Sequence, residues 1–105
     1  MENRQFVCSV TDLAPGSMRT FRVKGKQVAL ANVDGEYFAV DDSCTHNGCS
    51  LGTEGVLDGN VIICGCHGGQ FDVTNGKVMA PPPEKNTRSY TVKIADGNVY
   101  LEIHV

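Results

Sequence analysis

The sequence has no apolar segment long enough to cross a membrane as a helix. Such a helix needs roughly 18 or more consecutive apolar residues, and no run in the 105-residue chain approaches that length. The N-terminal segment also lacks the basic region and apolar stretch that mark a secretory signal. We therefore expect a soluble, cytoplasmic protein without a membrane anchor.

Strong charge of either sign is missing as well. The formal net charge is −3, and the acidic residues are scattered through the chain rather than gathered in a tail. A basic patch for phosphate groups is therefore not indicated, and we expect no nucleic-acid partner. Mild acidity instead suits transient docking onto a basic surface of another protein.

Sustained helical periodicity is absent, whereas turn signals are frequent. Asp-Gly or Asn-Gly pairs begin at positions 34, 58, 75 and 96, and such pairs favour the positive φ angles of hairpin turns. The best helical candidate is a short turn near residues 11–13. We predict a single all-β domain over residues 1–105, a small antiparallel sandwich or barrel. Its expected strands are rich in β-branched and aromatic residues and cover 28–33, 37–40, 61–64, 71–74, 90–94 and 99–105.

The central third of the chain has a different composition. Residues 43–53 and 65–70 are rich in Gly, Cys, His and small polar residues. They are predicted to form two loops, the second closing a hairpin. A third loop around residues 80–83 contains three consecutive prolines. Because proline cannot donate to a sheet, we expect this loop to be a stiff, extended cover.

The two Cys- and His-containing loops suggest a metal centre. Cys44 and His46 are spaced C-x-H, and Cys64 and His67 are spaced C-x-x-H. Each loop thus offers one thiolate and one imidazole. At neighbouring hairpin tips the four side chains can reach one centre. Two sulfide-bridged irons fit this set if each iron takes like ligands, as in Rieske centres, where two histidines replace two cysteines on one iron.

The spacing alone leaves two other metal sites open. A structural zinc site needs only the same four ligands and no inorganic sulfide. An all-cysteine cluster could use Cys44, Cys49, Cys64 and Cys66, although the C-x2-C that should follow the opening C-x4-C is missing. Five cysteines in so small an intracellular chain favour metal binding over disulfide bonds in any case.

Residues 44–49 and 64–69 resemble the two cluster-binding boxes of Rieske proteins, and we refer to them as the first box and the second box. The proline run resembles the third loop of that family. Chain length, acidity and residues 74–83 are similar to the Rieske ferredoxins of bacterial ring-hydroxylating dioxygenases. The resemblance covers nearly the whole chain and is most specific over a cluster-binding region of about residues 41–83.

The resemblance implies one [2Fe-2S] cluster, with Cys44 and Cys64 on the inner iron and His46 and His67 on the outer iron. Its implied role is a one-electron carrier between a flavin-dependent NAD(P)H reductase and a terminal aromatic-ring dioxygenase or other oxygenase. We expect a monomer that docks transiently. We do not expect an enzyme, because four protein ligands leave no open position on either iron.

Two further features are carried by the resemblance. Cys49 and Cys66 match positions that form a disulfide in quinol-oxidising Rieske proteins; two reduced thiols are the alternative in a reducing cytosol. Gly69 and Phe71 occupy the positions of a serine and a tyrosine that donate hydrogen bonds toward sulfur in high-potential relatives. The absence of these two hydroxyl groups predicts a reduction potential in the lower part of the Rieske range, which spans about −150 to +300 mV.

Other functional readings remain open at this point. The chain could be a small Rieske subunit of a reductase such as nitrite reductase, or a soluble quinol-oxidising-type Rieske protein. Asp41, Asp42 and Glu54 flank the first box and suggest either a docking rim or solvated turns. Cys8 is expected to be a buried core thiol, and His104 a solvated histidine.

Overall fold

The computed structural model describes residues 4–42, 49–65, 68–80 and 86–102. Strands dominate this part of the chain, which confirms the all-β prediction. No helix within these ranges is long and apolar enough to span a bilayer. The elements in chain order are β1 (Arg4–Ser9), η1 (Val10–Asp12), β2 (Met18–Val23), β3 (Lys26–Val33), β4 (Glu36–Asp41), α1 (Leu51–Glu54), β5 (Val56–Asp58), β6 (Val61–Ile63), β7 (Gln70–Asp72), β8 (Val78–Ala80), β9 (Ser89–Ala95) and β10 (Asn98–Glu102).

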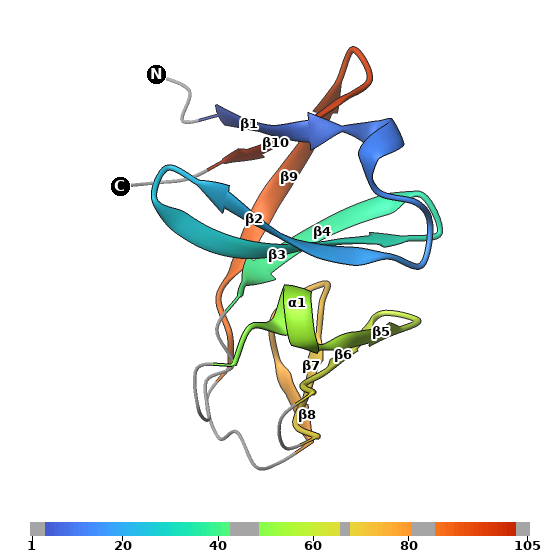
Figure 1. The fold of residues 1–105 in the computed structure, drawn as a ribbon, viewed down its shortest axis with the longest axis vertical. Coiled ribbons are helices and arrows are strands. Elements are labelled where there is room, and N and C mark those ends of the chain that lie inside the picture. The colour runs from blue at the N-terminus through green and yellow to red at the C-terminus, as the bar shows by residue number, and fades with distance from the viewer. Residues whose placement is uncertain (1–3, 43–48, 66–67, 81–85, 103–105) are drawn as a thin grey trace.

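Six strands form the larger of two antiparallel sheets. Their order is β1-β10-β9-β4-β3-β2. The two edge strands, β1 and β2, contact each other. The sheet therefore curls into a nearly closed barrel (Figure 1).

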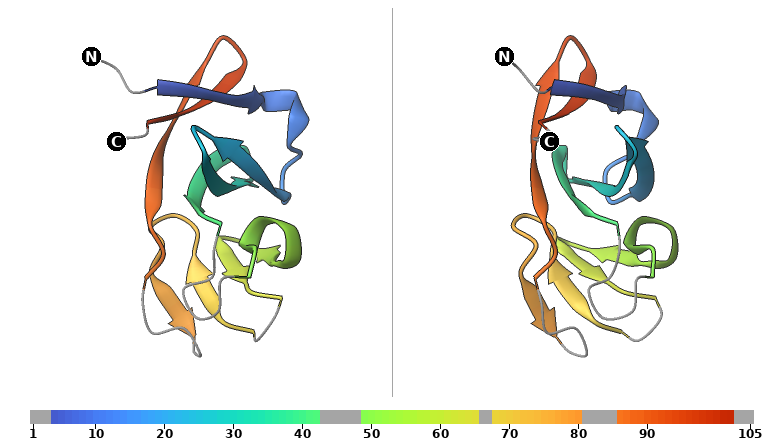
Figure 2. Two further views of the ribbon diagram at one scale, coloured as in Figure 1. Left: turned by 60° about the vertical axis from the view of Figure 1, so that its left-hand side comes forward. Right: turned by 90° about the vertical axis from the view of Figure 1, so that its left-hand side faces the viewer.

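The smaller sheet contains four short strands in the order β5-β6-β7-β8. It lies beyond one end of the large sheet, and α1 lies between the two (Figures 1 and 2). The chain passes to this sheet after β4 and returns to the large sheet at β9. Residues 42–80 are called the small subdomain below.

The hairpin turns form largely where the sequence indicated. Asp34 and Gly35 have φ angles of 52° and 93° between β3 and β4. Asp96 and Gly97 have φ angles of 52° and 76° between β9 and β10. Both pairs thus have the positive φ angles at both central residues that the favoured two-residue turns require. The turns around residues 58–60 and 75–76 also contain a glycine with positive φ.

Within the described ranges, five elements were not anticipated: the strands β1, β2, β5 and β8 and the helix α1. The strand β2 and its turn at Lys24-Gly25, with φ angles of 50° and 77°, were missed because lysine is not typical of left-handed turns. The helix α1 falls inside the predicted first loop. It has four residues and is therefore too short for any hydrophobic period. The predicted helical turn near residues 11–13 is present as the 3-10 helix η1.

The apolar side chains form two core clusters. One fills the barrel and includes Leu30, Val99, Leu101 and Cys8. Cys8 is only 4% exposed, which confirms the prediction of a buried thiol. Burial, with a contribution from Asp12, raises the pKa of this thiol and makes it unreactive.

The second core cluster lies between the two sheets and in the small subdomain. It contains Leu51 of α1, Ile62 of β6, Phe71 of β7 and the Cys64 side chain. All of these except Cys64 are fully buried, and Cys64 is 2% exposed. The beginning of the second box is thus anchored in a close-packed core rather than suspended in a loop.

Candidate metal centre

The structure describes Cys64 among the four predicted ligands. Cys64 directly follows β6, and its thiol is free and buried. Cys44, His46 and His67 lie outside the described residues, as does Cys66. Among the residues that are described, no group of three metal-ligating side chains occurs.

The second box begins and ends in a tight turn. The Cys64 N–H donates to the Gly69 carbonyl at 2.7 Å, and the Gly68 N–H donates to the Cys64 carbonyl at 3.0 Å. Gly68 has a φ of 75°, which an L side chain rarely adopts. These bonds close the base of the loop between β6 and β7, as predicted. They hold the backbone of Cys64, a predicted ligand, in one place.

The first box is closed at its base in a different way. The Leu51 N–H, at the start of α1, donates to the Asp42 carbonyl at 2.6 Å. The described residues on either side of the first box are therefore held together. Ser50 caps α1 because its side chain accepts a hydrogen bond from the Thr53 N–H.

A single row of paired residues forms one end of the small sheet. Val56 pairs with Ile63, Ile63 with Gln70, and Gln70 with Ala80. Ile63 leads into the second box, and Gln70 follows it. Ala80 leads into the proline run, and α1 ends just before Val56. We call this row the loop end of the small sheet, because the register brings together the residues that flank the second box, the residue that leads into the proline run and the strand that follows α1.

The helix α1 meets the second box at a point where only glycine fits. A methyl group added to Gly65 would overlap the carbonyl oxygen of Glu54, the last residue of α1. Gly65 directly follows Cys64, a predicted ligand. The distance between α1 and the second box is therefore set by backbone contact.

The segment that contains the proline run is also held at both ends. The Thr87 N–H donates to the Gly76 carbonyl at 2.8 Å, and the Val78 N–H donates to the Asn86 side-chain oxygen at 3.0 Å. Thr87 is buried. Both ends of residues 81–85 are thus fixed against the small subdomain.

Asp41, the last residue of β4, is bonded to the beginning of β9, at the point where the chain leaves the large sheet. The Asp41 N–H donates to the Arg88 carbonyl at 2.8 Å, and the Tyr90 hydroxyl donates a short hydrogen bond to the Asp41 carboxylate. Burial raises the pKa of Tyr90 to about 12, and the hydrogen bond to Asp41 and the charge of Asp41 add to this shift. The Arg88 guanidinium lies over the Tyr90 ring, 5.4 Å from its centroid.

The acidic residues around the first box do not form one rim. Asp42 is 2% exposed, so the expectation of a docking rim or a solvated turn is wrong for this residue. Its carboxylate points inward and accepts three hydrogen bonds. Asp41 is half-buried against Tyr90, and Glu54 is exposed. Sequence reasoning missed Asp42 because its partner Thr20 is distant in the chain.

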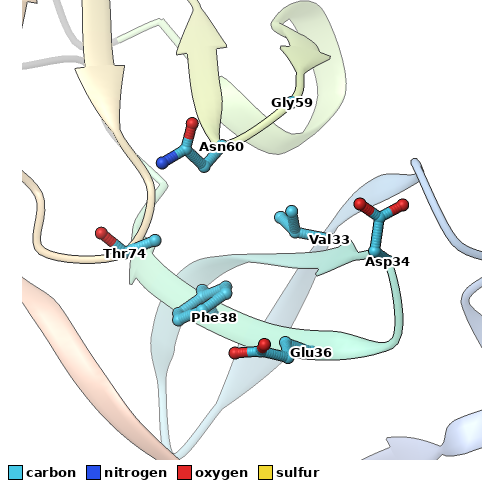
Figure 3. A pocket seen from close by; sticks show the side chains of 7 residues that line it. All are labelled: Val33, Asp34, Glu36, Phe38, Gly59, Asn60 and Thr74. Carbon is cyan, nitrogen blue, oxygen red and sulfur yellow. The ribbon is translucent and has the colours of Figure 1, made fainter.

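A surface groove of about 400 Å³ lies where the β3–β4 turn faces the small sheet (Figure 3). Gly59 and Asn60 line it and precede β6, whereas Cys64 follows β6. The groove is therefore at the opposite end of the small sheet from Cys64, the predicted ligand that the structure describes. Its full lining is Val33, Asp34, Glu36, Phe38, Gly59, Asn60 and Thr74.

Residues 3–91 match the model of the Rieske [2Fe-2S] domain family. This match covers most of the chain, and the chain belongs to that family. The protein therefore binds one [2Fe-2S] cluster. The free, buried thiol at Cys64 fits such a cluster, because cysteine sulfur is the kind of donor that holds iron–sulfur clusters.

Individual relatives indicate which kind of Rieske protein the chain resembles. The chain is 41% identical over 95 residues to the biphenyl dioxygenase ferredoxin subunit of Pseudomonas sp. (strain KKS102), covering 90% of this chain and 87% of that one. It is similar to the ferredoxin of Sphingomonas yanoikuyae B1, with a TM-score of 0.90 and 35% identity, covering 97% of this chain and 100% of that one.

A third relative was solved with a partner. It is the complex of reduced oxygenase and oxidized ferredoxin in carbazole 1,9a-dioxygenase, matched at a TM-score of 0.88 and 35% identity over 97% of this chain and 94% of that one. The relatives are named as ferredoxin components. The prediction of an electron-transfer component rather than an enzyme is therefore confirmed.

The contact between Gly65 and α1 can be tested by substitution. We expect Gly65→Ala to push the second box away from α1, because the added methyl group overlaps the Glu54 carbonyl oxygen. The purified variant should contain less iron and show an altered visible spectrum. Iron content per chain and visible absorption are the measurements.

Gly97→Ala is the control for backbone strain. Gly97 has a φ of 76° and no atom within 4 Å of an added methyl group. The substitution should cost roughly 1–2 kcal/mol of stability and leave iron content and spectrum unchanged. Parent-like iron content in Gly65→Ala would contradict the importance of the α1 contact.

The pKa of Tyr90 predicts a loss of stability in alkali. An ordinary tyrosine has a pKa of about 10, and that of Tyr90 is raised to about 12 in the folded protein. The unfolded chain therefore loses this proton first, so folding stability should fall as the pH rises from about 10 toward 12. Tyrosinate absorbance should show one of the three tyrosines ionising late.

Two variants can show whether Tyr90 is the tyrosine that ionises late. Tyr90→Phe should remove it, and Asp41→Asn should move it to lower pH, because the neutral amide no longer repels the tyrosinate. An unchanged late phase in Tyr90→Phe would mean that another tyrosine is responsible.

Proposed function

We propose that the chain receives single electrons from a flavin-dependent NAD(P)H reductase and passes them to a terminal oxygenase that acts on aromatic rings. The observation that carries this proposal is the match to the ferredoxin that was solved with its oxygenase, over 97% of this chain at a TM-score of 0.88. The naming of other relatives as ferredoxins of biphenyl and naphthalene dioxygenase systems supports it. We further propose that the protein works in the cytoplasm as a monomer.

We propose that Cys44 and Cys64 bind one iron of the cluster and that His46 and His67 bind the other. When bound, the [2Fe-2S] cluster takes up and releases one electron. Two thiolates balance the charge that two ferric ions and two sulfides leave, and the imidazoles add none. An all-thiolate site would carry two more negative charges and resist reduction, which is why histidine ligation raises the potential.

The surroundings of Cys64 support this assignment. The thiol lies at the base of a closed turn, in the core formed with Leu51 and Phe71. A ligand held on fixed backbone changes little in position when an electron is added. Little reorganisation is then needed, which suits a protein whose work is to accept and release electrons.

We propose that Cys49 and Cys66 form a disulfide that ties the two boxes together. In support, Cys49 is disulfide-bonded, and its partner lies outside the described residues. Cys49 also packs against the core cluster that contains Cys64. A bond that closes a loop of this size adds about 3 kcal/mol in the chain-entropy model. We infer that residues 1–105 form one domain in which residues 41–83 hold the cluster.

The ligand assignment and the role can be tested together. We expect the dithionite-reduced protein to show the electron paramagnetic resonance of a Rieske cluster. Mixing it with an oxidised oxygenase of the biphenyl dioxygenase type should return its visible spectrum to the oxidised form. His46→Ala and His67→Ala should abolish both signals, because alanine cannot bind iron.

His104→Ala is the matched control, since His104 is the third histidine of the chain and is not a proposed ligand. It should behave as the parent does. If His46→Ala and His67→Ala both kept the spectrum of the parent, the proposed ligand set would be wrong. A colourless parent with bound zinc would overturn the cluster, and elution with a larger subunit on gel filtration would argue against a free carrier.

Gly69, the last residue of the second box, and Phe71, just after it, predict a low reduction potential. Gly69 and Phe71 lack the hydroxyl groups that donate hydrogen bonds toward sulfur in high-potential relatives, and Phe71 is fully buried in the core. Protein-film voltammetry should place the potential in the lower part of the range of about −150 to +300 mV. Gly69→Ser should raise it. A parent value near the top of the range would contradict this reasoning.

A further inference from the structure

Asp42 is a buried carboxylate at the entrance to the first box. Its Oδ1 accepts hydrogen bonds from the Thr20 hydroxyl and the Gly52 N–H, both at 2.8 Å. Its Oδ2 accepts from the Ser50 hydroxyl at 2.6 Å. The residue is 2% exposed. Every partner in these three bonds is an uncharged group.

A buried carboxylate needs hydrogen-bond partners, because burying a polar group without them costs free energy. An apolar side chain could accept none of these three hydrogen bonds, and an amide has one acceptor oxygen instead of two. The carboxylate suits the geometry, because its two acceptor oxygens can hold three donors in fixed directions.

The three donors come from different parts of the fold. Thr20 belongs to β2 of the large sheet, Ser50 is the N-cap of α1, and Gly52 lies within α1. The Thr20 hydroxyl also lies 2.9 Å from the Thr53 hydroxyl and 3.1 Å from the Ser50 hydroxyl. A methyl group added to Gly52 would lie 2.6 Å from the Thr20 nitrogen. The carboxylate thus holds α1 in close contact with the large sheet.

The main chain of Asp42 reinforces this arrangement. Its N–H donates to the Gln27 carbonyl of β3 at 3.1 Å, and its carbonyl accepts from the Leu51 N–H. The other end of α1 abuts Gly65 in the second box. One helical turn therefore connects Asp42, which lies just before the first box, with Gly65, which follows Cys64.

We propose that Asp42 is a positioning residue that sets the spacing of the two cluster-binding boxes by fixing α1 between them. The proposal deepens the function proposed above and rests on its ligand set. Asp42 does not bind iron in this proposal. It acts through α1, and its loss lets the second box shift relative to the first.

The chain offers a closely matched control in Asn32. Asn32 is also 2% exposed. Its side chain also makes three hydrogen bonds, to the Leu13 carbonyl at 2.8 Å, the Tyr37 hydroxyl at 3.3 Å and the Gly35 N–H at 2.7 Å. These partners all lie around the barrel. Asn32→Ala should therefore reproduce the stability loss of Asp42→Ala without touching α1.

The test compares Asp42→Ala with Asn32→Ala, each loaded with iron and sulfide. The measurements are the thermal midpoint, the g values of the reduced cluster and the rate of iron loss to a chelator. Both variants should unfold at lower temperature than the parent. Asp42→Ala alone should show shifted g values and lose iron about 10-fold faster or more, as expected when a supporting partner of a metal site is removed.

Two milder substitutions at Thr20 test the proposal even if Asp42→Ala does not fold. Thr20→Val removes the hydroxyl at nearly constant volume, whereas Thr20→Ser keeps it. We expect Thr20→Val to shift the g values and Thr20→Ser to restore them. The proposal would be overturned if Asp42→Ala, or Thr20→Val where Asp42→Ala does not fold, had the g values and the rate of iron loss of the parent. Failure of the proposed function would instead appear in the parent, as a missing Rieske signal.

Discussion

The contact between the end of α1 and the residue after Cys64 constrains the rest of the small subdomain. Backbone meets backbone there, since a side chain larger than hydrogen at Gly65 overlaps the Glu54 carbonyl oxygen. Such a contact cannot be adjusted by a change of rotamer. The helix α1, which follows the first box, and Cys64, which begins the second box, are consequently held at a distance that the main chain sets.

The two sheets divide the work of the protein. The barrel has the longer strands and encloses the first core cluster. The small sheet has strands of only three residues and carries the loops at one end. Asp41 and Asp42 stand where the two sheets meet. Asp41, the last residue of β4, bonds to Tyr90 of β9, whereas Asp42, just after the strand, bonds to Thr20 of β2.

Local signals in the sequence predicted the parts of the fold that depend on local geometry. Asp34-Gly35 and Asp96-Gly97 form turns because these residues tolerate positive φ wherever they occur. Cys64 was placed correctly at the base of a hairpin loop. Asp42 was not understood from sequence, because its burial depends on Thr20, which only the folded chain brings near. The helix α1 was missed for the same reason, since one turn of helix is stable only through its capping and packing.

The strands at the edges of the sheets have a consequence for how the protein meets others. In the described part of the chain, the small sheet is bordered by β5 and β8, each of three residues, and the edges of the large sheet face each other. Neither sheet offers a long row of unpaired backbone groups to which a foreign strand could be added. Strand addition produces long-lived complexes through main-chain bonds. A carrier that must separate from one protein before meeting the next is better served by surfaces that join through side chains alone.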